Sequence, residues 1–194
     1  TIGGPMPHVE IKIVDPDTGQ TLPTGTKGEY CTRGYHVMHE YFEMPEATAE
    51  TIDQDGWLHT GDICSMDERG YCKVEGRLKD MIIRGGENIY PREIEALLFQ
   101  HPTVGEVAVV GLPDERLGEV VGAFIRSAPG QSPDQEELFA YLREHASPQK
   151  TPKHWFLMDA FPLTGSGKIQ KYVLREQWLD GKILEMRERP GIPQ

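Results

Sequence analysis

The stretch GRLKDMIIRGGENIYPREIE, residues 76–95, sets the organisation of the chain. Its apolar residues 81–83 and 89–90 flank the glycine pair Gly85-Gly86, which allows positive φ and close approach of the backbone. This arrangement predicts a β-hairpin. The alternative functions of such a turn remain open: a plain hairpin, or a backbone-lined slot for a thin ligand.

Local patterns on both sides of this stretch predict further elements. Period-two alternation and turn signals indicate strands over 9–13, 28–33, 57–65 and 70–75, with a short helix over 45–51. Apolar runs and helical spacing indicate strands over 107–112, 120–126 and 154–158 and helices over 91–100 and 171–179. Another helix is expected from the capping box Ser132–Gln135 to about Ala146, with Leu138, Phe139 and Leu142 inward, and a loose tail over 190–194. The pattern changes from mostly β to mixed near residues 76–80.

Composition and charge exclude several classes of protein. The chain is 38% hydrophobic and 26% charged, as in ordinary globular proteins. Its apolar runs are too short for a transmembrane segment and no secretory leader is recognisable, so a cytoplasmic protein is expected. The net charge of −11 argues against nucleic acid as a partner. Only residues 150–171, with four lysines and one acid, would suit a small polyanion or form a solvated surface loop.

The cysteines and histidines give little sign of cross-links or metal. Cys31, Cys64 and Cys72 show no C-x-x-C spacing, which favours free thiols in a reducing cytosol over a disulfide scaffold. His36 and His39 lie three residues apart, but no second ligand pair follows. We therefore expect no metal site in the chain.

Asp62 ends the motif GWLHTGD, residues 56–62. A carboxylate held by such a turn can accept two hydrogen bonds from a vicinal diol such as a ribose. Arg77 follows on the far side of the strand expected over 70–75, and a strand returning toward Asp62 would bring both side chains to one sugar. The alternatives are an aspartate that only forms a turn and an arginine paired with an acid at a domain edge.

Lys168 lies in the small loop LTGSGKI, residues 163–169. The loop is similar to a phosphate-binding P-loop but does not satisfy that motif, because Pro162 replaces a required glycine and Ile169 replaces the Ser or Thr after the lysine. A mobile loop that brings one cation to a phosphate is still compatible with the sequence, and lysine suits it as a compact charge on a flexible stem.

In order and spacing, these motifs resemble three successive signatures of the adenylate-forming enzymes, which include acyl-CoA synthetases, peptide-synthetase adenylation domains and beetle luciferases. The matching segments are GWLHTGD (56–62), GRLKDMIIRGGENIYPREIE (76–95) and PLTGSGKI (162–169). GGPMP (3–7) and GYHVMHEYFEMPEATAET (34–51) look like connecting segments of fatty-acyl-CoA synthetases. Many members carry a lysine where this chain has Ile83, beside Arg84, and that departure is closer to medium-chain fatty-acyl-CoA synthetases.

The resemblance implies an α+β fold in two parts. Residues 1–78 would form the C-terminal, β-rich part of the large adenylation domain, a partial β-barrel. Residues 79–194 would form a small, mobile α+β lid domain. The Ser/Thr/Gly-rich phosphate loop, the acid pocket and the Mg²⁺ ligands are expected upstream, so the chain would be an inactive fragment by itself.

The resemblance also implies a role for each motif. Asp62, Val74 and Arg77 would bind the nucleotide, ATP or AMP, and Lys79 would be the hinge. Lys168 would serve adenylation, in which a carboxylic acid attacks the α-phosphate of ATP. The run Gly85-Gly86-Glu87 would line the coenzyme A channel during thioester formation.

Three functions remain possible under this resemblance. The first is an AMP-forming fatty acid–CoA ligase with ATP, CoA and a small carboxylic acid as partners. The second is an aryl-acid CoA ligase or an adenylation domain that loads a carrier protein. The third is a non-catalytic nucleotide-binding or assembly module, which retention of Asp62, Arg77 and Lys168 together argues against. A homodimer is possible, because exposed edges can associate.

Overall fold

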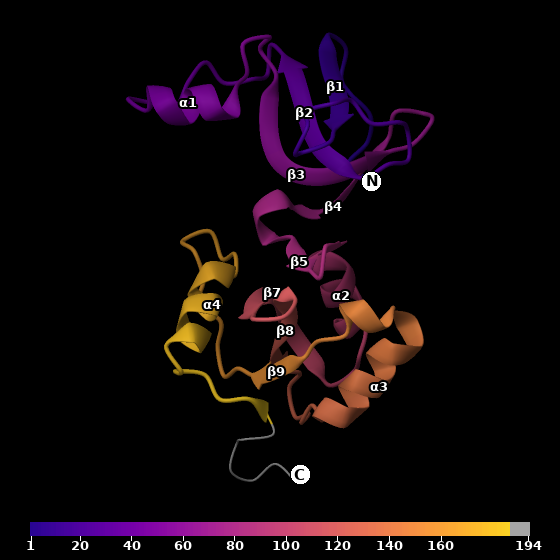
Figure 1. The fold of residues 1–194 in the computed structure, drawn as a ribbon, viewed down its shortest axis with the longest axis vertical. Coiled ribbons are helices and arrows are strands. Elements are labelled where there is room, and N and C mark those ends of the chain that lie inside the picture. The colour runs from indigo at the N-terminus through magenta and orange to yellow at the C-terminus, as the bar shows by residue number, and fades with distance from the viewer. Residues whose placement is uncertain (187–194) are drawn as a thin grey trace. The chain divides into compact units, whose positions relative to one another are not determined.

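The computed structural model describes residues 1–186 and divides into two compact units, Thr1–Lys79 and Asp80–Gln194. Each unit contains its own antiparallel-rich sheet with helices attached (Figure 1). The predicted α+β fold class is confirmed, and the sheet of the first unit is open, with strand order β1-β2-β3-β4. The assignment of the units to parts of a larger enzyme stays a prediction, as does the domain boundary between residues 78 and 79.

The first unit is an antiparallel meander. Its elements are β1 (Val9–Val14), β2 (Gly28–Gly34), α1 (Pro45–Thr51), β3 (Leu58–Met66), β4 (Cys72–Arg77) and the 3₁₀ turn η1 (Leu78–Asp80). Figure 1 shows β3 as a long, strongly curved strand. Gly28 is required at the start of β2, because a Cβ there would collide with the carbonyl oxygen of Val14. The small core of this unit includes Ile13, Ile63 and the three cysteines.

The second unit is built around the central strand β8. Its elements are β5 (Ile82–Arg84), β6 (Glu87–Ile89), α2 (Pro91–Leu98), β7 (Val104–Asp114), β8 (Gly118–Ser127), α3 (Gln135–His145), η2 (Pro148–Lys150), β9 (His154–Leu157) and α4 (Lys171–Leu179). Strand β8 pairs antiparallel with β7 and β5 and parallel with β9. Residues 82–89 form the predicted hairpin, and its strand β5 joins the sheet at Arg84, opposite Gly118.

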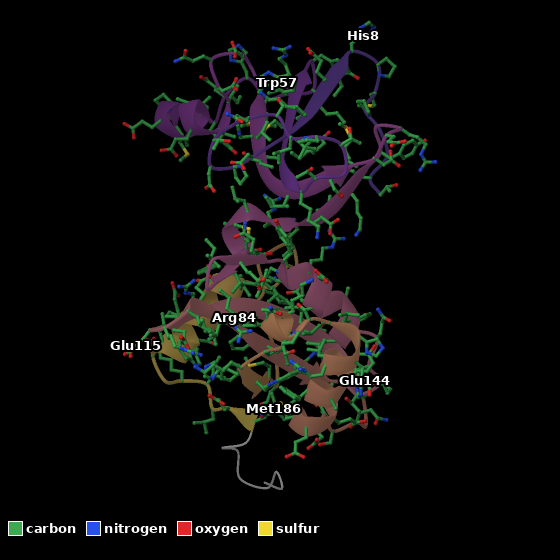
Figure 2. All side chains as sticks on the ribbon, turned by 45° about the vertical axis from the view of Figure 1, so that its right-hand side comes forward. His8, Trp57, Arg84, Glu115, Glu144 and Met186 are labelled. Atoms are coloured by element: carbon green, nitrogen blue, oxygen red, sulfur yellow. The ribbon has the colours of Figure 1, made fainter. Side chains whose placement is uncertain are left out.

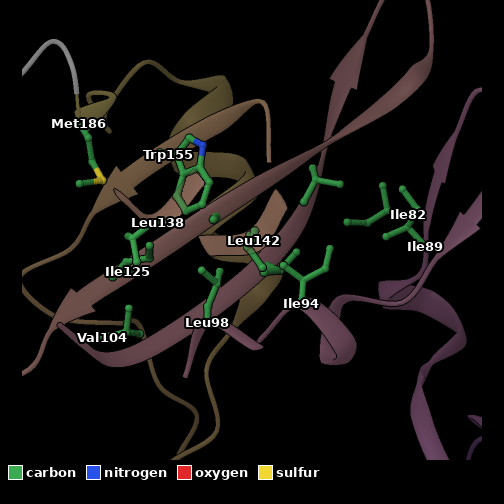
Figure 3. Packing of buried hydrophobic residues seen from close by; sticks show 13 residues of the cluster. Ile82, Ile89, Ile94, Leu98, Val104, Ile125, Leu138, Leu142, Trp155 and Met186 are labelled. Carbon is green, nitrogen blue, oxygen red and sulfur yellow. The ribbon is translucent and has the colours of Figure 1, made fainter. Parts of the chain in front are cut away.

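Both faces of the second sheet are covered, which explains the continuous apolar run in β8. Val121, Ala123 and Ile125 pack into one core with α2 and α3 (Figure 3). Val120 and Phe124 alternate with them and pack into a second core against Phe156 and Leu174. In Figure 3, Met186 lies beside Trp155 at one end of the first core.

Helix α3 differs from its prediction in two details. Its N-cap is Asp134, whose carboxylate accepts a hydrogen bond from the backbone N–H of Glu137 at 2.9 Å, so Ser132 is not the cap. Leu138 and Leu142 are fully buried, whereas Phe139 is 46% exposed. The reason is geometric, because residues four apart share a helix face and Phe139 lies about 100° around from Leu138.

The three cysteines are free and buried. Burial, with the nearby charge of Glu29, raises the pKa of Cys31 to about 12. At pH 8 the thiolate fraction of Cys31 is then on the order of 10⁻⁴, and the thiolate is the reactive form.

We therefore expect the native protein to resist Ellman's reagent at pH 8 and all three thiols to react after denaturation. Absorbance of the released thionitrobenzoate measures both rates. Rapid reaction of any of the three cysteines without denaturant would contradict the burial of these side chains.

Within residues 1–186, no helix has the length and apolar character that crossing a membrane requires. The loose tail expected over residues 190–194 lies outside the described residues.

Candidate functional site

Asp62 and Arg77 face each other on the neighbouring strands β3 and β4. They are direct partners in the antiparallel ladder, and Arg77 Nε lies 2.7 Å from Asp62 Oδ1. Arg77 also donates from a terminal guanidinium nitrogen to the carbonyl oxygen of Thr60 at 3.3 Å. In this ion pair the side chain of Arg77 is 50% exposed and that of Asp62 is 31% exposed, so both can be reached from solvent. The two side chains predicted to meet one sugar are thus adjacent.

The turn before Asp62 is held by hydrogen bonds from its own threonine. Thr60 Oγ1 donates to the carbonyl oxygen of Tyr30 at 2.7 Å and accepts from the N–H of Asp62 at 3.1 Å. Gly61 has φ +68°, a backbone conformation that residues with a Cβ rarely adopt. The Thr-Gly-Asp sequence therefore fixes the backbone from which the carboxylate of Asp62 extends.

Val74 and Lys79 lie on either side of Arg77 along the chain. Val74 is opposite Cys64 in the ladder and is half-buried. Lys79 is exposed in the 3₁₀ turn η1, as the last residue of the first unit. This position is compatible with the predicted hinge.

Trp57 of GWLHTGD, labelled in Figure 2, lies close to two cations of the first unit. Lys12 Nζ lies 4.3 Å and Arg33 Cζ lies 4.6 Å from the ring centroid. These are cation–π distances, which anchor the start of the motif to β1 and β2.

The glycine hairpin of the second unit is seated on the turn between β7 and β8. Gly85 and Gly86 have φ +58° and +86°, and Gly85 N–H donates to Leu117 O at 2.8 Å. Two N–H groups of that turn, those of Arg116 and Leu117, donate to Asp114. The carboxyl of Asp114 has its pKa lowered to about 2 by Lys153 and by these two N–H groups. The β7–β8 turn thus supports the tip of the glycine hairpin.

Two further contacts hold the strands of this hairpin. Glu119 accepts from the N–H of Ile83 at 3.1 Å through one carboxylate oxygen and from Arg175 of α4 at 2.9 Å through the other. Arg84, labelled in Figure 2, donates to the carbonyl oxygens of Pro148 and Gln149. Glycines 85 and 86 and Glu87 remain exposed at the tip.

Lys168 is presented by a closed loop. Leu163 and Ile169 form an antiparallel bridge at its base, and the backbone N–H of Thr164 donates to Lys168 O at 2.8 Å. Thr164 Oγ1 accepts from the N–H of Lys168 at 3.0 Å. The side chain of Lys168 is exposed.

The basic segment 150–171 is less basic than its sequence suggests. Carboxylates neutralise three of its four lysines: Lys150–Glu93 at 2.6 Å, Lys153–Asp114 at 2.7 Å and Lys171–Glu95 at 2.6 Å. Lys168 makes no ion pair with any residue in 1–186. The candidate anion-binding group is therefore one lysine and not a patch.

One group of side chains in the described part of the chain could hold a metal ion. The ligand atoms of Glu29, Cys31 and His59 lie within 4.8 Å of one another. His59 Nδ1 lies 2.8 Å from Glu29 Oε2 and 3.4 Å from Cys31 Sγ, so the three form a hydrogen-bonded cluster. A thiol and an imidazole do not suit Mg²⁺, which prefers oxygen ligands. The Mg²⁺ expected for an adenylating enzyme therefore has no fitting ligand set here.

Sequence reasoning missed Glu29, Thr164 and Glu119. Each of them accepts a hydrogen bond from a backbone N–H in a segment that carries a predicted site residue. No local pattern identifies Glu29, because β2 also contains Thr32 and Arg33 and the burial of Glu29 depends on the packing of the sheet.

Two family models match the chain. The AMP-binding enzyme model matches residues 1–42, and the model of the AMP-binding enzyme C-terminal domain matches residues 93–168. The chain therefore contains parts of both the AMP-binding domain and the AMP-binding C-terminal domain.

Individual relatives narrow the class. The chain is similar to the putative acyl-CoA synthetase YngI of Bacillus subtilis, with 52% identity over 93% of this chain and 33% of the relative. It is 51% identical to the mitochondrial medium-chain acyl-CoA ligase ACSF2 of Danio rerio, over 91% of this chain and 29% of that protein. ATP-bound MatB from Rhodopseudomonas palustris superposes with a TM-score of 0.86 and 38% identity, over 93% of this chain and 36% of that one.

The homologues are thus acyl-CoA synthetases and ligases, an enzyme class, and the chain is homologous to a C-terminal part of them. It spans about a third of the length of the curated relatives it matches.

Proposed function

We propose that the full-length protein is an ATP-dependent acid–CoA ligase. It activates a carboxylic acid as acyl-AMP and transfers the acyl group to coenzyme A, releasing pyrophosphate and AMP. Residues 1–78 are the C-terminal part of its large adenylation domain, residues 79–194 are its mobile C-terminal domain, and Lys79 is the hinge.

In the first half-reaction, a carboxylate oxygen attacks the α-phosphorus of ATP and the bond to pyrophosphate breaks. Negative charge grows on the phosphoryl oxygens, so a positioned cation lowers the barrier. We assign that cation to Lys168. Asp62 accepts hydrogen bonds from the ribose hydroxyls, and Arg77 and Val74 contact the same nucleotide.

In the second half-reaction, the thiol sulfur of coenzyme A attacks the acyl carbonyl carbon and AMP leaves with the bonding electrons. The thiol must reach the carbonyl through a narrow path. We assign the wall of that path to Gly85, Gly86 and Glu87, because glycine allows close approach of a thin pantetheine arm. The exchange of the Lys168 face for the Gly85-Gly86 face between the two steps is a conformational step of a known kind.

The observation that carries this proposal is the isolation of Lys168. Of the lysines in the basic segment, it is the one without a carboxylate partner among residues 1–186, and its loop is closed by hydrogen bonds of its own.

Further features of the full-length enzyme complete the proposal. A medium-chain fatty acid is the proposed substrate, supported by Ile83 and by the similarity to ACSF2. Three free, buried cysteines favour a reducing compartment such as the cytoplasm. Mg²⁺ ligands are expected elsewhere in the full-length enzyme, and light scattering would measure whether the enzyme forms the possible homodimer.

The test is ATP–pyrophosphate exchange by the full-length enzyme with acids from acetate to palmitate and with benzoate. We expect most exchange with medium-chain acids, and AMP release when coenzyme A is added. Exchange with benzoate alone would replace the substrate class with aryl acids. No exchange with any carboxylate would overturn the ligase function.

We expect Gly86→Leu to slow thioester formation by about tenfold or more and to leave adenylation near wild type. A Cβ at Gly86 meets nothing within 4 Å, so the leucine would extend into open space at the hairpin tip and narrow the thiol path. Rapid-quench assay of acyl-CoA from supplied acyl-adenylate measures the loss.

Gly130→Leu is the control for backbone strain. Gly130 has φ +72°, also has open space around its Cβ and lies outside the hairpin. Equal losses in the two variants would mean that strain, and not obstruction of the thiol path, causes the defect.

A further inference from the structure

The strand pairing between β2 and β3 is interrupted next to Asp62. Cys31 pairs with His59 and Glu29 pairs with Ile63, so Tyr30 alone stands opposite residues 60–62. Residues of β3 at this point bulge out of the ladder, and their backbone groups need partners other than the usual ladder bonds.

Glu29, on the neighbouring strand, supplies a partner for one of those backbone groups and for one side chain of β3. Its Oε1 accepts from the N–H of Gly61 at 3.0 Å, and its Oε2 lies 2.8 Å from Nδ1 of His59. The residue is only 7% exposed. A carboxylate is rarely buried to this degree unless it is fully paired, so this one has a specific partner set.

The two contacts of Glu29 lie on either side of Thr60 in the sequence. Thr60 lies between His59 and Gly61, and its hydroxyl accepts from the N–H of Asp62. Fixing His59 and Gly61 therefore fixes Thr60 and the backbone of Asp62. The side chain of Asp62 then extends toward Arg77 from a rigid base.

We propose that Glu29 is a positioning residue for the nucleotide site: its carboxylate takes the place of the missing ladder partner and holds the 59–62 bulge so that Asp62 is oriented toward the ribose. This inference rests on the proposed role of Asp62. It assigns to Glu29 no contact with the substrate and no part in either chemical step.

The carboxylate has a property that an amide lacks. Both of its oxygens accept, so it serves the N–H of Gly61 and, in the tautomer that carries hydrogen on Nδ1, the ring of His59 at once. A glutamine would present one oxygen and one NH₂, and His59 would have to accept at Nδ1. The KM for ATP of Glu29→Gln should therefore lie between those of wild type and Glu29→Ala.

The experiment uses the full-length enzyme and separates KM values. In ATP–pyrophosphate exchange, we expect Glu29→Ala to raise the KM for ATP about tenfold, with the KM for the carboxylic acid unchanged. Glu29→Gln should give a smaller rise. Gly61→Ala approaches the same turn independently: its Cβ would meet nothing within 4 Å, but the positive φ is unfavourable, so the ATP KM should rise here too.

Glu75→Ala is the matched control. Glu75 is a carboxylate of the same sheet with 11% side-chain exposure, against 10% for Glu29, and it bonds Ser65 and two lysines instead of the 59–62 bulge. We expect a similar loss of thermal stability in this variant without a selective change in the ATP KM.

Each result of this experiment bears on the inference. An unchanged ATP KM in Glu29→Ala and Gly61→Ala, or an equal rise in the KM values for ATP and acid, would overturn it. Calorimetric measurement of AMP affinity separates failure of the positioning role of Glu29 from failure of the proposed ligase function. Wild-type protein that binds AMP without exchanging pyrophosphate would refute the ligase function, and a weaker AMP affinity of Glu29→Ala would still support the positioning role. If Glu29→Ala does not fold, the KM values for ATP of Glu29→Gln and Gly61→Ala test the positioning role.

Discussion

Replacing Lys168 with alanine in the full-length enzyme is expected to lower ATP–pyrophosphate exchange by about 10²- to 10³-fold, the usual cost of losing one preorganised group that stabilises transition-state charge. Conversion of supplied acyl-adenylate and CoA to acyl-CoA should stay near wild type, because that step does not expel pyrophosphate. Lys168 is exposed and unpaired within residues 1–186, so its removal should not change the free energy of unfolding appreciably.

Two further variants test whether exchange depends on the position of the positive charge or only on its presence. Lys168→Arg keeps a cation but replaces a compact ammonium with a planar fork, and we expect partial recovery of exchange. Lys182→Ala removes an exposed lysine of the same unit that is paired with Asp180 at 2.7 Å, and should leave exchange unchanged. Unchanged exchange in Lys168→Ala would remove the catalytic role assigned to this lysine.

Replacing Asp62 with alanine is expected to raise the KM for ATP by about 10- to 100-fold, since hydrogen bonds to a charged group contribute about 1.5–3 kcal/mol. The effect on stability should be small by comparison. Arg77 and Asp62 form a partly exposed ion pair, and such pairs contribute about 0–1 kcal/mol. A functional loss without unfolding is therefore the signature that separates ribose binding from a purely structural ion pair.

The control for Asp62→Ala is Glu10→Ala. Glu10 also pairs with a partly exposed arginine of the first sheet, with Arg33 Nη2 at 2.8 Å, but lies outside the GWLHTGD motif. Initial-rate exchange over a range of ATP concentrations gives both KM values. If Asp62→Ala kept the wild-type KM, Asp62 would be only a turn residue with a structural partner.

Local pattern predicted most elements because burial on one face imposes a period on the sequence. Strand β1 alternates Val9, Ile11 and Ile13 with charged residues, and its observed bounds differ from the prediction by one residue. The cap of α3 was wrong because the pattern occurs twice: Ser132–Gln135 and Asp134–Glu137 both have the spacing of a capping box. Pattern alone does not choose between two overlapping signals.

The candidate site was predictable where its parts are close in sequence. Asp62 and Arg77 lie on consecutive strands of a hairpin, so the predicted return of the chain brings them together. Gly61 and its acceptor Glu29 lie 32 positions apart, and Lys150 and Glu93 lie 57 apart. Contacts of that separation depend on strand register and tertiary packing, which no local period encodes.

The central claim is that two faces of the second unit serve different half-reactions, and one crossed measurement tests it most directly. Both half-reactions are assayed separately in the full-length Lys168→Ala and Gly86→Leu variants: pyrophosphate exchange for adenylation, and acyl-CoA from supplied acyl-adenylate for thioester formation. We predict that Lys168→Ala loses exchange and keeps thioester formation, and that Gly86→Leu does the reverse. Loss of the same half-reaction in both variants would contradict the claim.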